Sequence, residues 1–294
     1  MPRMHSFASV ALALIALIFG PSTTLAAETG APEPEETATS TGGEADAFPG
    51  REIYFYVDVL ELEELQELHA SDAAHIIDVR TRYEYDTLRV EGAQHVSLDD
   101  PDFVAKVREL HARDPGLPVV FYCRGHTCFM GYQAAEKMLS AGFEDVFNMD
   151  AGIFDWAQAY PEETAMFGEA PIERADLIDF NKFREHLLPP REFAEIAHQD
   201  EARVLDIRRP FERDQIGLFL GNETNIPAAD RERLEPFLDE VRDSSDPLLV
   251  YDITGHEIKA FQYTLEQQGI SDYYFMEGGF KAFQEQLLRR GSAD

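Results

Sequence analysis

Apolar residues follow two different periodicities along the chain from residue 51 onward. Four short continuous runs, rich in β-branched side chains, predict strands buried on both faces of a sheet, at residues 74–79, 119–123, 202–207 and 248–252. Elsewhere apolar positions recur every three or four residues, which predicts amphipathic helices. These helices are expected at residues 60–70, 102–112, 132–142, 189–199, 233–243 and 259–269. The alternation predicts an α/β fold, with a mostly parallel sheet flanked by helices on both faces.

The pattern occurs twice in the same order. Three pairs of segments match: "HIIDVR" with "RVLDIR", "PVVFYC" with "PLLVYD", and "AGFEDVFNMDAGIFDW" with "QGISDYYFMEGGFKAF". Glu84 and Glu212 also occupy equivalent positions. Ordered repetition predicts two tandem domains of one kind. We place them at residues 51–160 and 177–294, joined by an interdomain linker at residues 161–176.

The first 50 residues differ from the rest. A basic tip with Arg3 precedes an apolar run of about fourteen residues, and small side chains follow near Ala26. This arrangement is typical of a secretory signal peptide, which we expect at residues 1–27. The run is shorter than the roughly 20 residues of a transmembrane helix, although an uncleaved anchor stays open as an alternative. Residues 28–50, rich in Pro, Thr, Gly and Glu, predict a disordered acidic linker.

These features predict an exported protein, periplasmic in a bacterium, which contacts a membrane only if the signal segment is retained. The 294 residues carry a formal net charge of −31, with 5 Lys and 20 Arg. So acidic a chain repels the phosphate backbone, and we expect no nucleic-acid partner. An anionic substrate must therefore be attracted by donors within the site itself.

Both cysteines of the chain lie in the segment "FYCRGHTCFMGY". Cys123 ends a predicted strand, and the next helix is expected to begin near Gly131. In parallel α/β units this position gathers backbone N–H groups and a helix N-terminus, which favour an anion and favour thiolate over thiol. Arg124 adds a charge-assisted donor, and Gly125 permits a tight turn. The pattern predicts a nucleophilic thiolate at Cys123.

Over residues 56–290 the chain resembles the rhodanese (sulfurtransferase) family, specifically its tandem two-domain members. The resemblance is carried by "IDVR" and "LDIR", by "EYDTLRVEGAQHVS", by "YCRGHTC" as the catalytic loop and by "AGIFDW" as the closing motif. It implies that Cys123 takes sulfur from a small anionic donor, thiosulfate-like or a persulfide, and passes it as a persulfide to a thiol or cyanide acceptor. The implied substrate-binding residues are Arg124, Gly125, His126 and Thr127. No cofactor and no metal are expected.

The second unit departs from the family pattern. Asp252 stands at the position of the nucleophile, and a carboxylate carries no persulfide and repels an anionic donor. We expect this unit to be catalytically inactive and to shape the cleft of the first. Two-domain relatives usually keep their cysteine in the second unit, so the resemblance leaves the substrate preference open. The loop after Cys123 is expected to be two residues longer than the loop after Asp252, with Cys128 in the extension.

Several roles are open for Cys128. It fits a static structural disulfide with Cys123 in an oxidising compartment. It also fits a resolving thiol that attacks the Cys123 persulfide, expels sulfide and leaves a disulfide for a reductant to reopen. Zinc bound by Cys123, His126 and Cys128 is disfavoured, because three ligands within six residues give poor tetrahedral geometry. Phosphatase chemistry on a related fold is disfavoured because it needs Cys-x5-Arg, and position 129 is Phe.

Sulfurtransferase activity through a Cys123 persulfide is thus the leading hypothesis. One alternative is an exported thiol-disulfide or persulfide redox protein that uses Cys123 and Cys128. Another is a non-catalytic module that binds an oxyanion or a partner in the same loop.

Overall fold

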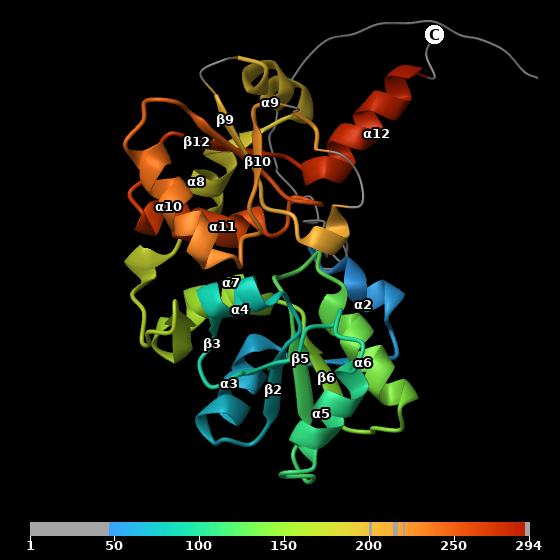
Figure 1. The fold of residues 1–294 in the computed structure, drawn as a ribbon. Coiled ribbons are helices and arrows are strands. Elements are labelled where there is room, and N and C mark those ends of the chain that lie inside the picture. The colour runs from blue at the N-terminus through green and yellow to red at the C-terminus, as the bar shows by residue number, and fades with distance from the viewer. Residues whose placement is uncertain (1–46, 200–201, 214–216, 220, 292–294) are drawn as a thin grey trace, which may run out of the picture. The chain divides into compact units, whose positions relative to one another are not determined.

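The computed structural model describes residues 47–199, 202–213, 217–219 and 221–291, which contain two parallel five-stranded sheets (Figure 1). The strand order in the first sheet is β1-β6-β5-β2-β4. These strands are Asp58–Val59 (β1), Val146–Met149 (β6), Val119–Tyr122 (β5), His75–Asp78 (β2) and Gln94–His95 (β4). Every neighbouring pair is parallel, as the buried apolar runs predict.

The second sheet repeats this order as β8-β12-β11-β9-β10. Its strands are Leu187–Leu188 (β8), Tyr273–Met276 (β12), Leu248–Tyr251 (β11), Arg203–Asp206 (β9) and Glu223–Asn225 (β10). The register repeats as well, since Asp78 pairs with Tyr122 in the first sheet and Asp206 with Tyr251 in the second. The prediction of two tandem α/β domains of one kind is confirmed.

Helices cover both sheets, and the six predicted helices are present with ends within two residues of the expected ones. The longer helices are Leu62–Ala70 (α3), Phe103–His111 (α5), Met130–Ser140 (α6), Gly152–Ala159 (α7), Pro190–Ala197 (α9), Arg231–Arg242 (α10), Ile258–Gln267 (α11) and Gly279–Gly291 (α12). Shorter ones are Pro49–Ile53 (α2), Arg82–Thr87 (α4) and Phe180–Glu185 (α8). Every residue of the central strands β5 and β11 is buried, as expected for strands covered on both faces.

The two repeats share one apolar cluster, which runs from the first sheet into the second. At their boundary Tyr83 of α4 packs on Phe261 of α11, with ring centroids 6.2 Å apart. The hydroxyl of Tyr83 also lies 2.5 Å from Oγ1 of Thr264. Aromatic burial of this kind stabilises contacts by roughly 25 cal/mol per Å² of apolar surface, and it places α11 beside the helix that follows β2.

The predicted interdomain linker carries structure of its own. Strand β7 (Thr164–Met166) pairs antiparallel with β3 (Leu88–Val90) of the first repeat. Short 3-10 turns at Pro161–Glu163 and Arg174–Asp176 lie on either side of it. Because Thr164 and Ala165 are buried, the start of this segment belongs to the first repeat and is not a loose connection.

The end of the predicted acidic linker is also packed. Helix α2 begins at Pro49, and Arg51 donates to the buried carboxylate of Asp150 at 2.8 Å. The ring of Phe48 lies 4.1 Å from the ring of His126, centroid to centroid. Order therefore begins before residue 51, because an aromatic contact and a partly buried ion pair offset the entropy cost that the polar composition suggested.

The signal peptide and most of the acidic linker lie outside the described residues and stay predictions. Among the helices that are described, none combines the length and the apolar character needed to cross a bilayer.

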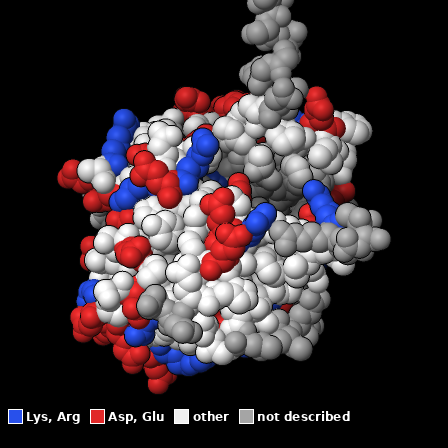
Figure 2. Space-filling model, turned by 90° about the horizontal axis from the view of Figure 1, so that it is seen from above, with Lys and Arg blue, Asp and Glu red and all other residues white. Residues whose placement is uncertain are grey.

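Surface charges are mixed in sign. On the face seen in Figure 2, Lys and Arg side chains are scattered among Asp and Glu. Many exposed arginines pair with a carboxylate one helical turn away, such as Arg82 with Asp86 and Arg191 with Glu195. Each such pair contributes at most about 1 kcal/mol. Because the chain has 56 acidic and only 25 basic residues, most basic side chains are expected to lie near a carboxylate, and one that does not is unusual.

Candidate active site

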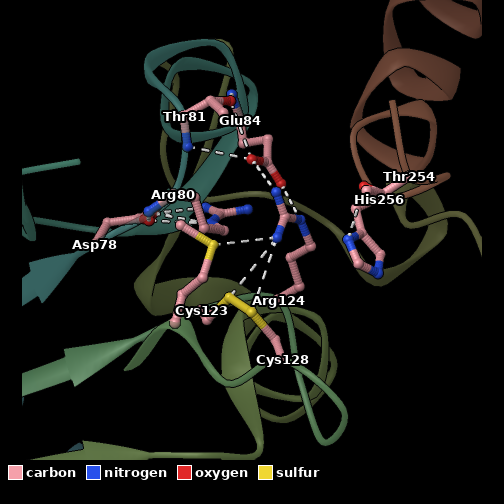
Figure 3. The surroundings of a disulfide bond; sticks show 10 residues. Asp78, Arg80, Thr81, Glu84, Cys123, Arg124, Cys128, Thr254 and His256 are labelled. Atoms are coloured by element: carbon pink, nitrogen blue, oxygen red, sulfur yellow. Dashed lines mark hydrogen bonds and ion pairs between the residues drawn. A yellow bond between two sulfur atoms is a disulfide. The ribbon is translucent and has the colours of Figure 1, made fainter. Parts of the chain in front are cut away.

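The cysteine loop joins β5 to α6 at the carboxyl end of the first sheet. Cys123 directly follows β5 and is 3% exposed, whereas Cys128 is partly exposed. The two sulfur atoms form a disulfide, with Cα atoms 6.2 Å apart (Figure 3). The structure therefore shows the oxidised loop, which is compatible with both the static and the resolving role of Cys128.

The loop is longer than its counterpart by less than the sequence suggested. Seven residues, 123–129, separate β5 from α6, and six residues, 252–257, separate β11 from α11. The expected extension of two residues is present between the end of β5 and the start of β6, compared with β11 and β12, but one of the two residues lies in α6, which begins at Met130. Cys128 still lies in the longer loop.

Arg124 connects the two sulfur atoms to a buried carboxylate. Its Nε and Nη2 donate to Oε1 and Oε2 of Glu84 at 2.5 and 2.6 Å. Its Nη1 lies 3.9 Å from Sγ of Cys123 and 3.8 Å from Sγ of Cys128. Figure 3 shows the guanidinium between the carboxylate and the sulfur atoms. Because Glu84 binds two nitrogens of the guanidinium, the orientation of the group is fixed, and its remaining N–H donors point toward the two sulfur atoms.

Sequence reasoning did not identify Glu84 as a site residue. It is 1% exposed, and a capping box with Thr81 holds it at the start of α4. Burial opposes its ionisation, but the charges of Arg124 and Arg80 outweigh that effect and hold the pKa of Glu84 below its usual range. The spacing Thr-x-x-Glu and the equivalence with Glu212 were the signals that pointed to it.

The second repeat arranges the same groups differently. Ile253 follows Asp252 where Arg124 follows Cys123, so this loop has no arginine at that position. Glu212 instead pairs with Arg209, a neighbour on its own segment, at 2.5 Å. The second loop therefore lacks the guanidinium that the first loop holds against its sulfur atoms.

Several backbone donors of the cysteine loop are unused. Within the described part of the chain, the N–H groups of Arg124, Gly125, His126 and Thr127 donate to no protein acceptor. The N–H of Cys128 donates to the carbonyl of Gly125 at 2.8 Å. Unpaired amides in a turn that precedes a helix are the donors that hold an anion.

In the second repeat Asp252, which is 2% exposed, accepts from four backbone N–H groups of its own loop and of the helix start that follows. The N–H groups of Thr254, at 3.0 Å, and of Gly255 donate to Oδ1. Those of Glu257 and Ile258 donate to Oδ2 at 2.6 and 3.3 Å. Burial raises the pKa of Asp252 above its ordinary value, against the opposing effect of these hydrogen bonds. The carboxylate thus occupies the anion site of its own loop.

The closing motif, residues 151–156, packs against the backbone of the cysteine loop. The N–H of Ile153 donates to the carbonyl of Cys123 at 3.0 Å, and in the second repeat Phe280 makes the equivalent bond at 2.9 Å. Gly152 has φ +72°, and a Cβ there would lie 2.3 Å from the backbone N of Gly125. Only glycine satisfies both the positive φ and this close approach.

The remaining predicted residues lie at the mouth of the site. Nε2 of His126 is 2.7 Å from Oδ2 of Asp155, and Thr127 is exposed. The side chain of His126 therefore contacts a carboxylate. The contribution of His126 and Thr127 to the loop is their backbone N–H groups, which have no protein acceptor. His256, the counterpart of His126, approaches the same region from the second repeat (Figure 3).

A cavity of about 340 Å³ opens above the loop and is lined by both repeats. The first repeat contributes residues 124–128, Phe154 and Asp155, and the second contributes Phe180, Phe183, Gly255, His256 and Lys259. A larger cavity of about 610 Å³ lies near the linker and has neither cysteine in its lining. Among the described residues, no cluster of three or more His, Cys, Asp or Glu side chains is arranged to hold a metal ion.

Glu257 brings a second carboxylate close to the site. The hydroxyl of Thr81 lies 2.8 Å from Oε1 of Glu257 and 3.0 Å from Oε2 of Glu84. Burial, and then the charge of Glu84, raise the pKa of Glu257 to about 8. Glu257 therefore binds its proton more tightly than an exposed glutamate does, and the Thr81 hydroxyl, which can donate to either carboxyl group, lies between the two. This chain of contacts links the second loop to Arg124.

Two matches to one family model coincide with the two repeats. The model, described as "Rhodanese-like domain", matches residues 61–159 and 189–286, which together are more than half of the chain. Thiosulfate sulfurtransferase GlpE of Pseudomonas fluorescens is 33% identical over 104 residues, covering 35% of this chain and 87% of that protein. The tRNA uridine(34) hydroxylase of Cytophaga hutchinsonii is 31% identical over 99 residues, covering 33% of this chain and 30% of that protein.

Similar solved structures include a thiosulfate sulfurtransferase from Pseudomonas aeruginosa, with 19% identity and a TM-score of 0.35. The similarity covers 78% of this chain and 42% of that one, so less than half of that structure is spanned. The human single-domain sulfurtransferase TSTD1 has 23% identity and a TM-score of 0.29, over 35% of this chain and 96% of its own.

Proposed function

The chain belongs to the rhodanese-like domain family, and from this premise we propose that it is a rhodanese-type sulfurtransferase that acts through Cys123. It moves sulfane sulfur from a small anionic thiosulfate-like or persulfide donor to a thiol or cyanide. The observation that supports this most directly is the contrast between the two loops. The N–H groups of residues 124–127 have no protein acceptor, whereas in the second repeat the N–H groups of Thr254, Gly255, Glu257 and Ile258 donate to Asp252.

The proposed reaction starts from the reduced loop. The Cys123 thiolate attacks the outer sulfur of thiosulfate, a new S–S bond forms, and sulfite leaves with the electron pair of the broken S–S bond. The persulfide then lies among the open amides of the loop, and Arg124 offsets its charge. A thiolate or cyanide attacks the outer sulfur, and Cys123 departs as a thiolate ready for another cycle.

The second repeat supports this chemistry without performing it. Asp252 has no sulfur to carry, and its carboxylate fills the donors that would bind an anion. The second repeat instead contributes His256 of its loop and Lys259 of α11 to the cavity above the cysteines.

The disulfide itself favours a second candidate function, the reductive release of sulfide. In that reaction the Cys128 thiolate attacks Sγ of the Cys123 persulfide, a disulfide forms, and hydrosulfide leaves. A thiol reductant must then supply two electrons to reopen the loop. The two candidates differ in the fate of the sulfur, which goes to an acceptor in the first and leaves as sulfide in the second.

Thiocyanate formation from thiosulfate and cyanide tests the first candidate on protein that has been reduced and freed of reductant. Wild type and Cys128→Ser are expected to turn over, and Cys123→Ser is expected to form no thiocyanate. Sulfide release that needs both cysteines, without thiocyanate, contradicts transfer and supports the second candidate. If neither product forms, the loop is a binding module for an oxyanion or a partner.

We also propose that the protein is exported, on the strength of the N-terminal pattern. N-terminal sequencing of the protein recovered from a bacterial periplasm is expected to show a new terminus after residue 26 or 27. An intact N-terminus in the membrane fraction would instead identify a retained anchor.

A further inference from the structure

Of the two cysteines, Cys128 is the one that lines the cavity above the loop. This residue is partly exposed and lines the cavity, whereas Cys123 is 3% exposed and does not belong to the lining. A thiolate that enters the cavity therefore meets Sγ of Cys128. Attack there makes Cys123 the leaving group, and Nη1 of Arg124, 3.9 Å from its sulfur, stabilises the departing thiolate.

Lys259 gives the cavity a positive charge without a close counterion. Its Nζ lies 3.6 Å from the ring centroid of Phe154, and no carboxylate oxygen among the described residues lies within 4.0 Å of it. The other basic side chains of the lining differ, since Arg124 is held by Glu84 and His126 lies 2.7 Å from a carboxylate oxygen of Asp155.

Partial burial lowers the pKa of Lys259 to about 8, although the nearby charge of Asp155 acts in the opposite direction. The ammonium form still predominates at neutral pH. A partly desolvated ammonium beside an aromatic ring is stabilised by an anion that enters the cavity, because the anion replaces the lost hydration.

The walls of the cavity are aromatic. Phe154, Phe180 and Phe183 line it, and Phe180 is 62% exposed, which leaves an apolar surface open to a ligand. A volume of about 340 Å³ falls within the roughly 300–1,000 Å³ of pockets that bind small organic molecules. The combination fits an organic anion with an apolar body better than a bare inorganic ion.

Building on the sulfurtransferase proposed above, we propose that this cavity binds an anionic organic thiol and directs its thiolate to Sγ of Cys128. The charged group lies at Lys259, and the apolar body packs on the phenylalanines. This ligand reopens the disulfide and so releases Cys123 for sulfur transfer.

The redox step uses two equivalents of the thiol. The first thiolate forms an S–S bond with Cys128, the bond between Cys128 and Cys123 breaks, and Cys123 takes the electron pair. The second thiolate attacks the sulfur of the bound thiol in this mixed disulfide, and Cys128 leaves as a thiolate. The two small thiols are oxidised to their disulfide, and the protein disulfide is reduced by two electrons.

Two aromatic thiols of similar size test the inference: 4-mercaptobenzoate, which carries a carboxylate besides its thiolate, and 4-mercaptobenzamide, which has an uncharged amide in place of the carboxylate. The oxidised full chain is mixed with each, quenched with an alkylating agent and analysed by intact mass for the rate of disulfide opening. Lys259→Met is expected to slow opening by 4-mercaptobenzoate about tenfold, the effect of one charge-assisted contact, and to change opening by the amide less than about twofold.

Two further variants serve as controls. Lys106→Met removes an exposed lysine charge of the first repeat and is expected to leave both rates unchanged. Phe180→Ala is expected to slow both thiols by a similar factor of about three, because it removes apolar wall but no charge. Because Phe180 is exposed, replacing it by alanine is expected to leave the packing of the hydrophobic core unchanged.

Equal loss with both thiols, or no loss, on Lys259→Met overturns the inference. Thiocyanate formation by the pre-reduced protein is measured separately. Its absence, with the charge effect of Lys259 present, removes the proposed sulfurtransferase but leaves the thiol pocket. Its presence without the charge effect removes the thiol pocket but leaves the sulfurtransferase.

Discussion

The hydroxyl of Thr81 in the first repeat lies 2.8 Å from Oε1 of Glu257 in the second. The same hydroxyl is 3.0 Å from Glu84, so two buried carboxylates share one small polar group. Only Glu84 faces the guanidinium of Arg124 directly, and Glu257 accordingly keeps its proton near neutral pH. The boundary between the repeats therefore contains a titratable contact next to the cysteine loop.

Glu257→Gln is expected to make stability less dependent on pH. The pKa of Glu257 is about 8 in the folded protein, raised by burial and by Glu84 from the usual 4.5. The folded state then binds this proton more tightly than the unfolded state, so wild type loses stability as pH rises from about 5 to about 8. As pH rises from about 5 to about 8, the free energy of unfolding of the glutamine variant should therefore rise by about 3 kcal/mol relative to that of wild type. Denaturant titrations at several pH values check this, and a constant difference contradicts it.

Gly152→Ala is expected to destabilise the protein by more than Gly92→Ala. Both glycines have positive φ, +72° and +74°, so each alanine costs about 1 kcal/mol for its backbone conformation. A Cβ at Gly152 would also lie 2.3 Å from N of Gly125, whereas Gly92 has nothing within 4 Å. The clash should add about 2 kcal/mol or more and slow reactions of the cysteine loop. Chemical denaturation of the matched pair measures the difference, and equal losses would show that the closing motif does not support the loop.

Asp252→Asn is expected to destabilise the second repeat by about 2 kcal/mol. The asparagine keeps one acceptor oxygen but turns an NH₂ group toward backbone donors, which leaves buried N–H groups unpaired. Asp243→Asn, at an exposed position, is the control and should stay within about 0.5 kcal/mol of wild type. Thermal and denaturant unfolding provide the measurement. Similar small effects for both variants would mean that the carboxylate does not fill the loop as described.

Arg124→Lys is expected to lower kcat/KM for thiosulfate about tenfold or more in the thiocyanate assay. Lysine cannot bind both oxygens of Glu84 while presenting another donor to the sulfur atoms. The matched control is Arg209→Lys, which breaks the equivalent pair with Glu212 in the second repeat and should change kcat/KM less than about twofold. A comparable loss from both substitutions would assign Arg124 a structural role.

Local patterns predicted most of the fold and the position of Cys123 at the end of a buried strand. Continuous apolar runs identified the buried strands, and the duplication placed Cys123 and Asp252 at equivalent strand ends. These features depend on neighbours along the chain, for which residue type and spacing are sufficient. The ordered end of the acidic linker was missed because the Phe48 contact is made with a residue far along the sequence.

The rest of the site depends on how the repeats pack. Lys259 and Glu257 lie on a helix start that looks like an ordinary solvent-facing segment in the sequence. Their importance comes from Phe154 and Thr81, which are brought near them by the contact between α4 and α11. The sequence likewise indicated that Asp252 replaces the nucleophile, but not that its carboxylate would bind four amides of its own loop.

Asp252 also provides an internal reference for spectroscopy. Gly125 and Gly255 each lie against the closing motif of their repeat, with different backbone conformations, and only the N–H of Gly255 is bound by a carboxylate. Their two amide resonances therefore report the empty and the occupied loop within one molecule. An anion that binds the cysteine loop should move the Gly125 signal toward that of Gly255, while the Gly255 signal stays in place. The second repeat thus provides the reference state against which anion binding in the first repeat is measured.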